Sequence, residues 1–121
     1  MKAIRIVSES GNVDSVLSRF NDIIEELPHI NFKFAEIHQC LSRMPIDKND
    51  PNFYPLRLYS NNGITFFISE VRCGYRGHSC DCMIEILKNA GFSLSQKVID
   101  TIYNKPNLQI TIWKEEGIQQ F

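Results

Sequence analysis

The stretch LRLYSNNGITFFISEV, residues 56–71, decides the fold class of this chain. Two runs rich in β-branched and aromatic residues flank the dipeptide Asn62-Gly63. This dipeptide is typical of tight hairpin turns, because it tolerates the positive φ that both turn positions need. The second run, residues 64–71, places apolar side chains on both faces of the expected strand. We therefore predict an antiparallel hairpin whose second strand lies inside a sheet.

The residues before this hairpin predict a strand, a long helix and another strand. Residues 2–8 and 30–38 alternate in the way that strands do, and we expect Ile30, Phe32 and Phe34 to share one face. Between these strands, apolar residues recur at spacings of three and four, which is typical of an amphipathic helix. The apolar stripe of this helix consists of Val13, Val16, Leu17, Phe20, Ile23, Ile24 and Leu27.

The residues after the hairpin predict two helices and a last strand. A helix over about 80–90 is followed by Gly91, which suits a left-handed C-cap. A second helix over 94–104 has Ser93 as its expected N-cap, and residues 107–113 alternate as a strand does. The element order is then β-α-β-β-β-α-α-β, which indicates an α+β fold with a mixed or antiparallel sheet.

Length and composition indicate one folded domain. The chain has 121 residues, of which 43% are hydrophobic and 22% are charged, and this balance is ordinary for a protein with one hydrophobic core. We expect a single domain over residues 1–114, followed by a polar C-terminal tail over residues 115–121. The net charge of −1 argues against a general binder of nucleic-acid polymers, which would carry a basic excess.

The sequence predicts neither a signal peptide nor a membrane span. The N-terminal MKAIRIVSES has only a short apolar run and no small-residue cleavage site. No stretch approaches the roughly 18 apolar residues that a membrane-spanning helix needs. We therefore expect a cytoplasmic protein that does not associate with membranes. In that compartment its four cysteines are more often free, metal-bound or redox-active than paired in structural disulfides.

A segment of unusual composition, SEVRCGYRGHSCDCMIEIL at residues 69–87, joins the hairpin to the next helix. A strand that passes through a glycine-flanked turn into a helix presents unpaired backbone N–H groups, and the helix dipole adds positive potential there. Arg76 would supply a charged fork for phosphate, and Tyr75 a ring that stacks on a base. The alternative is a tight connector with exposed polar residues. The candidate ligand-binding residues are Gly74, Tyr75, Arg76, Gly77, His78 and Ser79.

Two further arginines are candidate phosphate contacts. Arg43 belongs to a long segment, residues 42–55, that contains three prolines and that we expect to be a loop. Loops of this length in a small domain are often functional. Arg57 lies on the predicted hairpin. We therefore add both arginines to the ligand-binding set, with ordinary surface residues as the alternative.

Four potential zinc ligands lie within ten residues, at Cys73, His78, Cys80 and Cys82. The Cys-x2-Cys spacing of zinc knuckles is absent, and side chains two positions apart on a helix diverge by about 200°. Two alternatives to a zinc site are open. The cysteines can be small core residues, or Cys80 can be a nucleophile whose pKa is lowered by the helix N-terminus and by His78. No other constellation indicates a catalytic set, so we expect no cofactor and no enzymatic activity.

The stretch GYRGHSCDCMIEILKNAGF, residues 74–92, together with the hairpin before it, resembles the first family of Thoeris anti-defence proteins of phages. These are sponge proteins that sequester cyclic ADP-ribose isomers. The similarity covers about a third of the chain. It implies a non-enzymatic binder that acts as a homo-oligomer, a dimer or a hexamer, with pockets at subunit boundaries. The implied ligand is a cyclic ADP-ribose-type signal, and some relatives also take cyclic oligonucleotides.

Two functions are therefore expected, and they belong to different classes. In the first, the protein sequesters a cyclic nucleotide-type immune signal, which is a small anionic ligand, and so blocks bacterial anti-phage defence in the host cytoplasm. In the second, it is a small cytoplasmic protein-interaction module, such as a toxin immunity protein. Small size and the lack of a catalytic set fit both functions.

Overall fold

The computed structural model describes residues 2–8, 11–40, 43–114 and 119–120, and its strands form one six-stranded sheet in the order β1-β4-β3-β2-β5-β6. The pairing of β1 with β4 is parallel and the other pairings are antiparallel, so the sheet is mixed. The strands are β1 (Lys2–Ile6), β2 (Phe32–Gln39), β3 (Leu56–Ser60), β4 (Ile64–Ile68), β5 (Leu108–Trp113) and β6 (Gln119–Gln120). The helices are α1 (Val13–Glu26), α2 (His78–Asn89) and α3 (Gln96–Asn104), with a 3-10 turn η2 (Pro51–Phe53) before β3.

The predicted α+β class and the order β-α-β-β-β-α-α-β are confirmed, with one short strand added at the end. This added strand, β6, pairs with the edge of β5 and lies in the segment that the sequence predicted as a polar tail. Residues 115–118 and 121 of that segment lie outside the described residues. Strand β4 lies between β1 and β3, as the apolar residues on both of its faces predicted.

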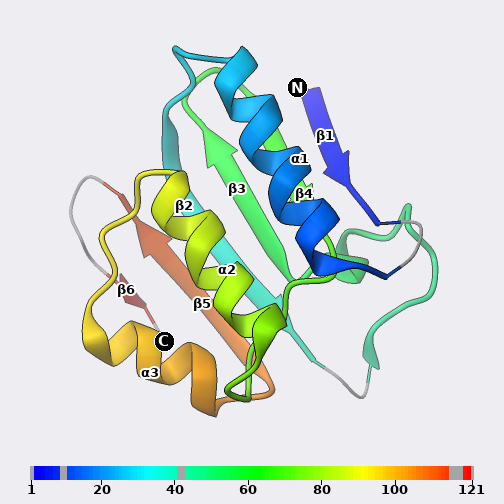
Figure 1. Cartoon of the computed structure of the whole chain (residues 1–121), viewed down its shortest axis with the longest axis vertical. Coiled ribbons are helices and arrows are strands. Elements are labelled where there is room, and N and C mark those ends of the chain that lie inside the picture. Colours follow the sequence, from blue (N-terminus) through cyan, green and yellow to red (C-terminus); the bar gives the residue numbers. More distant parts are fainter. Residues whose placement is uncertain (1, 9–10, 41–42, 115–118, 121) are drawn as a thin grey trace.

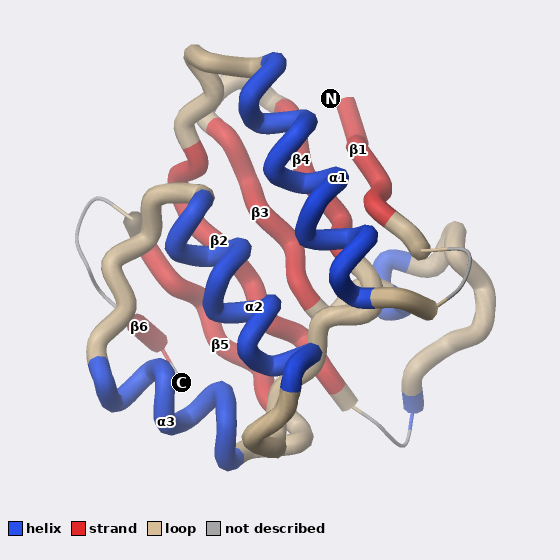
Figure 2. Tube along the Cα trace, viewed as in Figure 1, coloured by secondary structure: helices blue, strands red, loops and turns tan. Residues whose placement is uncertain are grey.

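Helices α1 and α2 lie side by side across one face of the sheet, and both begin at the same end of the molecule (Figure 1). Figure 2 shows the same arrangement, with α3 at the margin of the sheet near β5. The core fills the space between helices and sheet. At its centre the ring of Phe20 lies 5.8 Å from that of Phe66 and 6.3 Å from that of Phe32, and all three side chains are buried. Aromatic contacts of this kind contribute about 0.5–1.5 kcal/mol each beyond the area that they bury.

Among the described residues, the opposite face of the sheet carries none of the helices α1, α2 and α3, and we call it the helix-free face. Phe34 lies on this face, where its ring stacks 4.5 Å from Tyr59 and lies 4.7 Å from Trp113. The expectation that Phe32 and Phe34 share a face is therefore wrong. The reason is a register shift between these two residues, which reverses the alternation of side chains along β2.

Three local predictions can be compared with the structure. The hairpin at residues 61–63 forms, but only Gly63 has a positive φ, at 81°. Gly91 has a φ of 98°, and the amide of Phe92 donates back into α2, which confirms the predicted helix ending. The expected cap Ser93 is wrong: helix α3 begins two residues later than predicted, and the side chain of Ser95 caps it. None of the helices in the described part of the chain has the length and apolar character needed to cross a bilayer.

Candidate functional site

The bend between β4 and α2, residues 73–77, has two sides. On its inner side, the backbone groups of Cys73 and Gly74 form hydrogen bonds with the rest of the molecule. Gln39 is 1% exposed, and its amide nitrogen donates to the carbonyl of Cys73 at 3.0 Å and to that of Pro106 at 2.7 Å. The amide of Cys73 donates in turn to the side-chain oxygen of Gln39 at 3.1 Å. The amide of Gly74 donates to the carbonyl of Ile102 at 2.7 Å. Two of the backbone N–H groups that we predicted to be open to an anion are therefore used inside the molecule.

All three cysteines of residues 69–87, namely Cys73, Cys80 and Cys82, are buried. Burial, and after it the nearby Cys80 thiol, raise the pKa of the Cys73 thiol to about 12. Burial also raises the pKa of Cys80, although the backbone N–H of Tyr75 donates toward its sulfur. The interpretation of Cys80 as a nucleophile with a lowered pKa is therefore wrong. Cys73 and Cys82 belong to the hydrophobic core, as the alternative interpretation of these two as small core residues predicted, and Cys80 is also buried.

The outer side of the bend carries exposed side chains. Tyr75 is 48% exposed. The guanidinium of Arg76 lies 4.6 Å from the centre of the Tyr103 ring and 3.9 Å from a carboxylate oxygen of Asp100. The hydroxyl of Tyr103 donates to Asp81 at 2.5 Å, and this hydrogen bond is the main cause of a raised pKa at Tyr103. The outer side is therefore a small polar surface made by the bend and by α3.

Helix α2 begins at the outer side with no side-chain cap. Its N-cap is Gly77, and His78, which we expected to precede the helix, is its first residue. Ser79, one of the predicted ligand-binding residues, is the second residue of the helix, and its carbonyl accepts from the amide of Arg72 at 3.3 Å. Because glycine has no side chain, the N-cap residue offers no side-chain acceptor to the first-turn amides at the positive end of the helix dipole.

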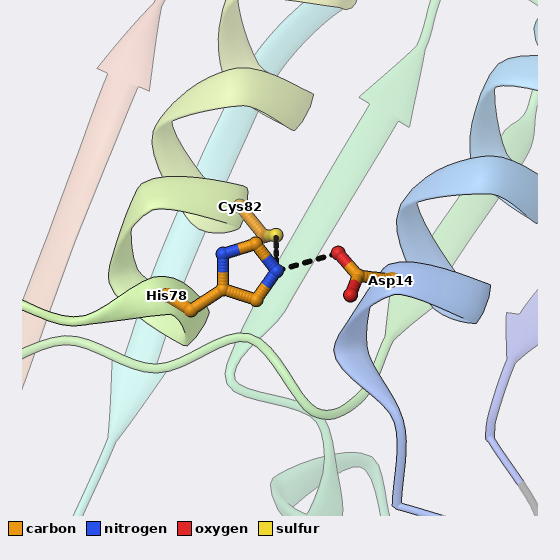
Figure 3. Close-up of side chains that lie close together, drawn as sticks. All are labelled: Asp14, His78 and Cys82. Atoms are coloured by element: carbon orange, nitrogen blue, oxygen red, sulfur yellow. Dashed lines mark hydrogen bonds and ion pairs between the residues drawn. The ribbon is translucent and has the colours of Figure 1, made fainter.

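A second group of polar side chains gathers where the N-terminal ends of α1 and α2 meet (Figure 3). The Nε2 atom of His78 lies 2.5 Å from Oδ1 of Asp14 and 3.9 Å from Sγ of Cys82. Asp14 is on the first turn of α1, and its backbone amide donates to the side chain of the N-cap residue Asn12. Asp14 and His78 are exposed, whereas Cys82 is 2% exposed. Burial and the neighbouring carboxylates, Asp14 first among them, raise the pKa of Cys82.

The structure does not bring together the predicted zinc set of Cys73, His78, Cys80 and Cys82. Among the described residues, the atoms that converge are those of Asp14, His78 and Cys82, all within 4.8 Å of one another. The sequence signal for two of them was present, because residues four apart on a helix share one face. Asp14 had no signal, since only the packing of α1 against α2 places it there.

The two added arginines lie apart from the bend, on the side of the helix-free face. Arg57 donates to the carbonyl of Pro51 and to the side chain of Asn52, both at 3.1 Å. Arg43 lines a pocket of about 240 Å³ together with His38, Cys40, Asn52 and Gln109. The eight predicted ligand-binding residues therefore form two groups on opposite sides of the sheet.

Comparison of this chain with protein-family models, with curated proteins and with solved structures finds no match.

Proposed function

We propose that the protein is a non-enzymatic binding protein that sequesters a cyclic nucleotide-type signal, and that the ligand's phosphate is held on the outer side of the bend. The observation that carries the proposal is that two consecutive residues, Tyr75 and Arg76, expose a ring and a guanidinium directly before a helix whose N-cap is Gly77. A ring offers stacking to a base, and a guanidinium and helix amides offer hydrogen bonds to phosphate.

The contact of Arg76 with Asp100 leaves the guanidinium available. The two groups lie 3.9 Å apart, and their side chains are 69% and 47% exposed. Exposed pairs of this kind contribute at most about 1 kcal/mol. A hydrogen bond to a charged group contributes about 1.5–3 kcal/mol. We therefore expect a phosphate to displace Asp100 from Arg76.

The ligand class, the block of anti-phage defence, the homo-oligomer and the place in the host cytoplasm enter this proposal through the resemblance to the Thoeris sponge proteins. The absence of catalysis is supported by the two buried thiols of raised pKa, Cys73 and Cys80. A sponge needs groups that hold phosphate and base, and it needs no activated nucleophile.

The test is isothermal titration of the full chain with cyclic ADP-ribose isomers and with cyclic di- and trinucleotides. We expect saturable heat with one ligand class, and binding at least about tenfold weaker in Arg76→Ala, a loss of about 1.4 kcal/mol. Arg19→Ala is the matched control, because Arg19 is an exposed arginine of α1. Arg57→Ala tells whether the phosphate lies at the bend or near Arg43 and Arg57. This variant should leave binding unchanged if the phosphate lies at the bend.

Two results would contradict this proposal. One is the absence of heat with every ligand at tens of micromolar protein. The other is unchanged binding in Arg76→Ala by a protein that remains folded.

The helix-free face favours the second candidate function, a protein-interaction module such as an immunity protein. Phe34, Tyr59 and Trp113 stack there and are only partly buried, and Arg57 and Glu36 are register partners on the neighbouring strands β3 and β2. Aromatic residues and arginine are enriched in protein interfaces. This function predicts a stoichiometric protein partner that co-purifies with the chain and is lost in Trp113→Glu. Release of a small nucleotide from the heated protein, with no protein partner, would exclude it.

A further inference from the structure

We infer that Asp14, His78 and Cys82 form a binding site for a transition-metal ion of the zinc type. A carboxylate oxygen, an imidazole nitrogen and a thiol sulfur lie within 4.8 Å of one another at the junction of α1 and α2. Figure 3 shows the carboxylate and the sulfur directed at the same ring nitrogen from two different helices. The inference stands apart from the nucleotide proposal, with which it shares only His78.

A proton on Nε2 of His78 satisfies Asp14 and leaves the thiol of Cys82 with only a weak contact at 3.9 Å. If Nε2 of His78 carries a proton, it donates to Asp14 at 2.5 Å and has no lone pair for the thiol of Cys82. If Nε2 is unprotonated, it accepts from the thiol, and two lone pairs then face each other across the short contact with Asp14. A cation placed between the three atoms accepts one lone pair from each of them at once.

The distances require only small movements to reach tetrahedral coordination. Bond lengths of about 2.0–2.3 Å to zinc imply separations of about 3.3–3.6 Å between ligand atoms. The separation of Nε2 from Sγ, 3.9 Å, has to close slightly, and the separation of Nε2 from Oδ1, 2.5 Å, has to open. Asp14 and His78 can make this adjustment because their side chains are 65% and 63% exposed. Cys82, 2% exposed on α2, is the fixed member of the site.

The donor set selects the kind of metal. Sulfur and imidazole nitrogen suit zinc and related ions, whereas magnesium and calcium prefer oxygen ligands alone. The thiolate and the carboxylate balance the charge of a divalent ion. Asp14 lies in the first turn of α1, where the helix dipole favours negative charge. Three protein ligands leave a fourth position for water or another ligand.

The same three side chains do not have the geometry of a nucleophilic triad. In such triads the imidazole contacts the nucleophile through one nitrogen and the carboxylate through the other. Here Asp14 and Cys82 both contact Nε2 of His78, and Cys82 is buried. This arrangement favours metal ligation over acid–base catalysis.

Cobalt titration of the full chain, freed of metal with a chelator and kept reduced, tests the inference. We expect one equivalent of Co²⁺ to bind with the visible bands of a tetrahedral ion and a thiolate charge-transfer band, and we expect one equivalent of Zn²⁺ to displace it. His78→Ala and Cys82→Ser should each weaken binding at least about 100-fold, since even residues that only support metal ligands cost 10–100-fold. Asp14→Asn should weaken binding about tenfold or more, and circular dichroism would verify that each variant is folded.

Cys40→Ser is the matched control, because Cys40 and His38 line a pocket elsewhere in the molecule. This variant should bind cobalt as the parent does. Loss of binding in Cys40→Ser with retention in His78→Ala would overturn the inference, and so would the absence of a thiolate band at one equivalent. If Cys82→Ser does not fold, the exposed His78 and Asp14 variants decide the question. Nucleotide titrations in the presence of chelator keep the two proposals distinguishable.

Discussion

The inner and outer sides of the bend differ in what their polar groups contact, although the residues of both sides lie within one short segment, residues 73–77. On the inner side, Gln39 and the carbonyl of Ile102 bind the amides of Cys73 and Gly74. On the outer side, Tyr75 and Arg76 face solvent. This difference shows that part of a glycine-flanked strand–helix connection can be closed to a ligand while another part is open. Only the part that the rest of the fold leaves uncovered is available for binding.

The largest difference in the free energy of unfolding should appear when the two glycines are replaced. Gly74 lies on the inner side of the bend and Gly77 on the outer side. Gly74 has a φ of 102°, and a Cβ there would lie 2.4 Å from the backbone of Pro106. We expect Gly74→Ala to lower the free energy of unfolding by about 3 kcal/mol, from the strained φ and the contact together. The three atoms nearest to a Cβ at Gly77 belong to the half-exposed ring of Tyr75, which can turn away, so Gly77→Ala should cost less than about 1 kcal/mol. Urea denaturation measures both, and equal losses would contradict the division.

A smaller loss of stability is expected when Gln39, whose side chain forms hydrogen bonds with the inner side of the bend, is replaced. Gln39→Leu leaves the amide of Cys73 and the carbonyls of Cys73 and Pro106 without their partner. Unsatisfied buried groups cost about 1–3 kcal/mol each, and the added apolar contact offsets part of this, so we expect a net loss of about 2 kcal/mol. Gln109→Leu, on the exposed side of β5, should change stability by less than about 0.5 kcal/mol. Equal unfolding midpoints for the two variants would show that the buried contacts are unimportant.

Titration of the buried Cys73 thiol, on the inner side of the bend, should change stability less than the replacement of Gln39 does. The pKa of Cys73 rises from its ordinary 9.0 to about 12 on folding, so between these values the folded state holds a proton that the unfolded state has lost. Stability from this thiol is therefore complete below pH 9 and is lost as the pH rises toward 12. Urea denaturation between pH 8 and pH 10 should show a smaller decline in Cys73→Ala than in the parent. Parallel declines would place the thiol in contact with solvent.

The smallest effect on stability should come from the outer side. Arg76→Ala removes an exposed ion pair with Asp100 and a contact with the ring of Tyr103. Exposed interactions of both kinds contribute less than about 1 kcal/mol, so the unfolding midpoint should barely move. A loss above about 2 kcal/mol would mean that Arg76 is part of the fold and is not a ligand contact.

Most of the fold was predictable from the sequence because periodicity reports which face of an element is buried. The stripe of α1 and the two apolar faces of β4 are of this kind. The register shift beside Phe34 was missed, although the apolar residues change phase there, from Ile30, Phe32 and Phe34 to Ala35 and Ile37. The pairing of β6 with β5 had no apolar pattern to indicate it.

The candidate site was predictable only where its residues are neighbours in the sequence. The segment around Arg76 has its own composition, and His78 and Cys82 are one helical turn apart. The division into inner and outer sides depends on Gln39, and the metal-ligand cluster depends on Asp14. Both residues come from distant parts of the chain, and only tertiary packing brings them to the bend.

Hydrogen exchange, followed amide by amide in the native protein, tests the division of the bend most directly. We predict that the amides of Cys73 and Gly74, bound to Gln39 and Ile102, are protected on the order of 10³-fold or more. The amides of His78 and Ser79, in the first turn of a helix without a side-chain cap, should exchange at nearly unprotected rates. Equal exchange at the four positions would contradict the account, because the inner side would then be as open as the outer side.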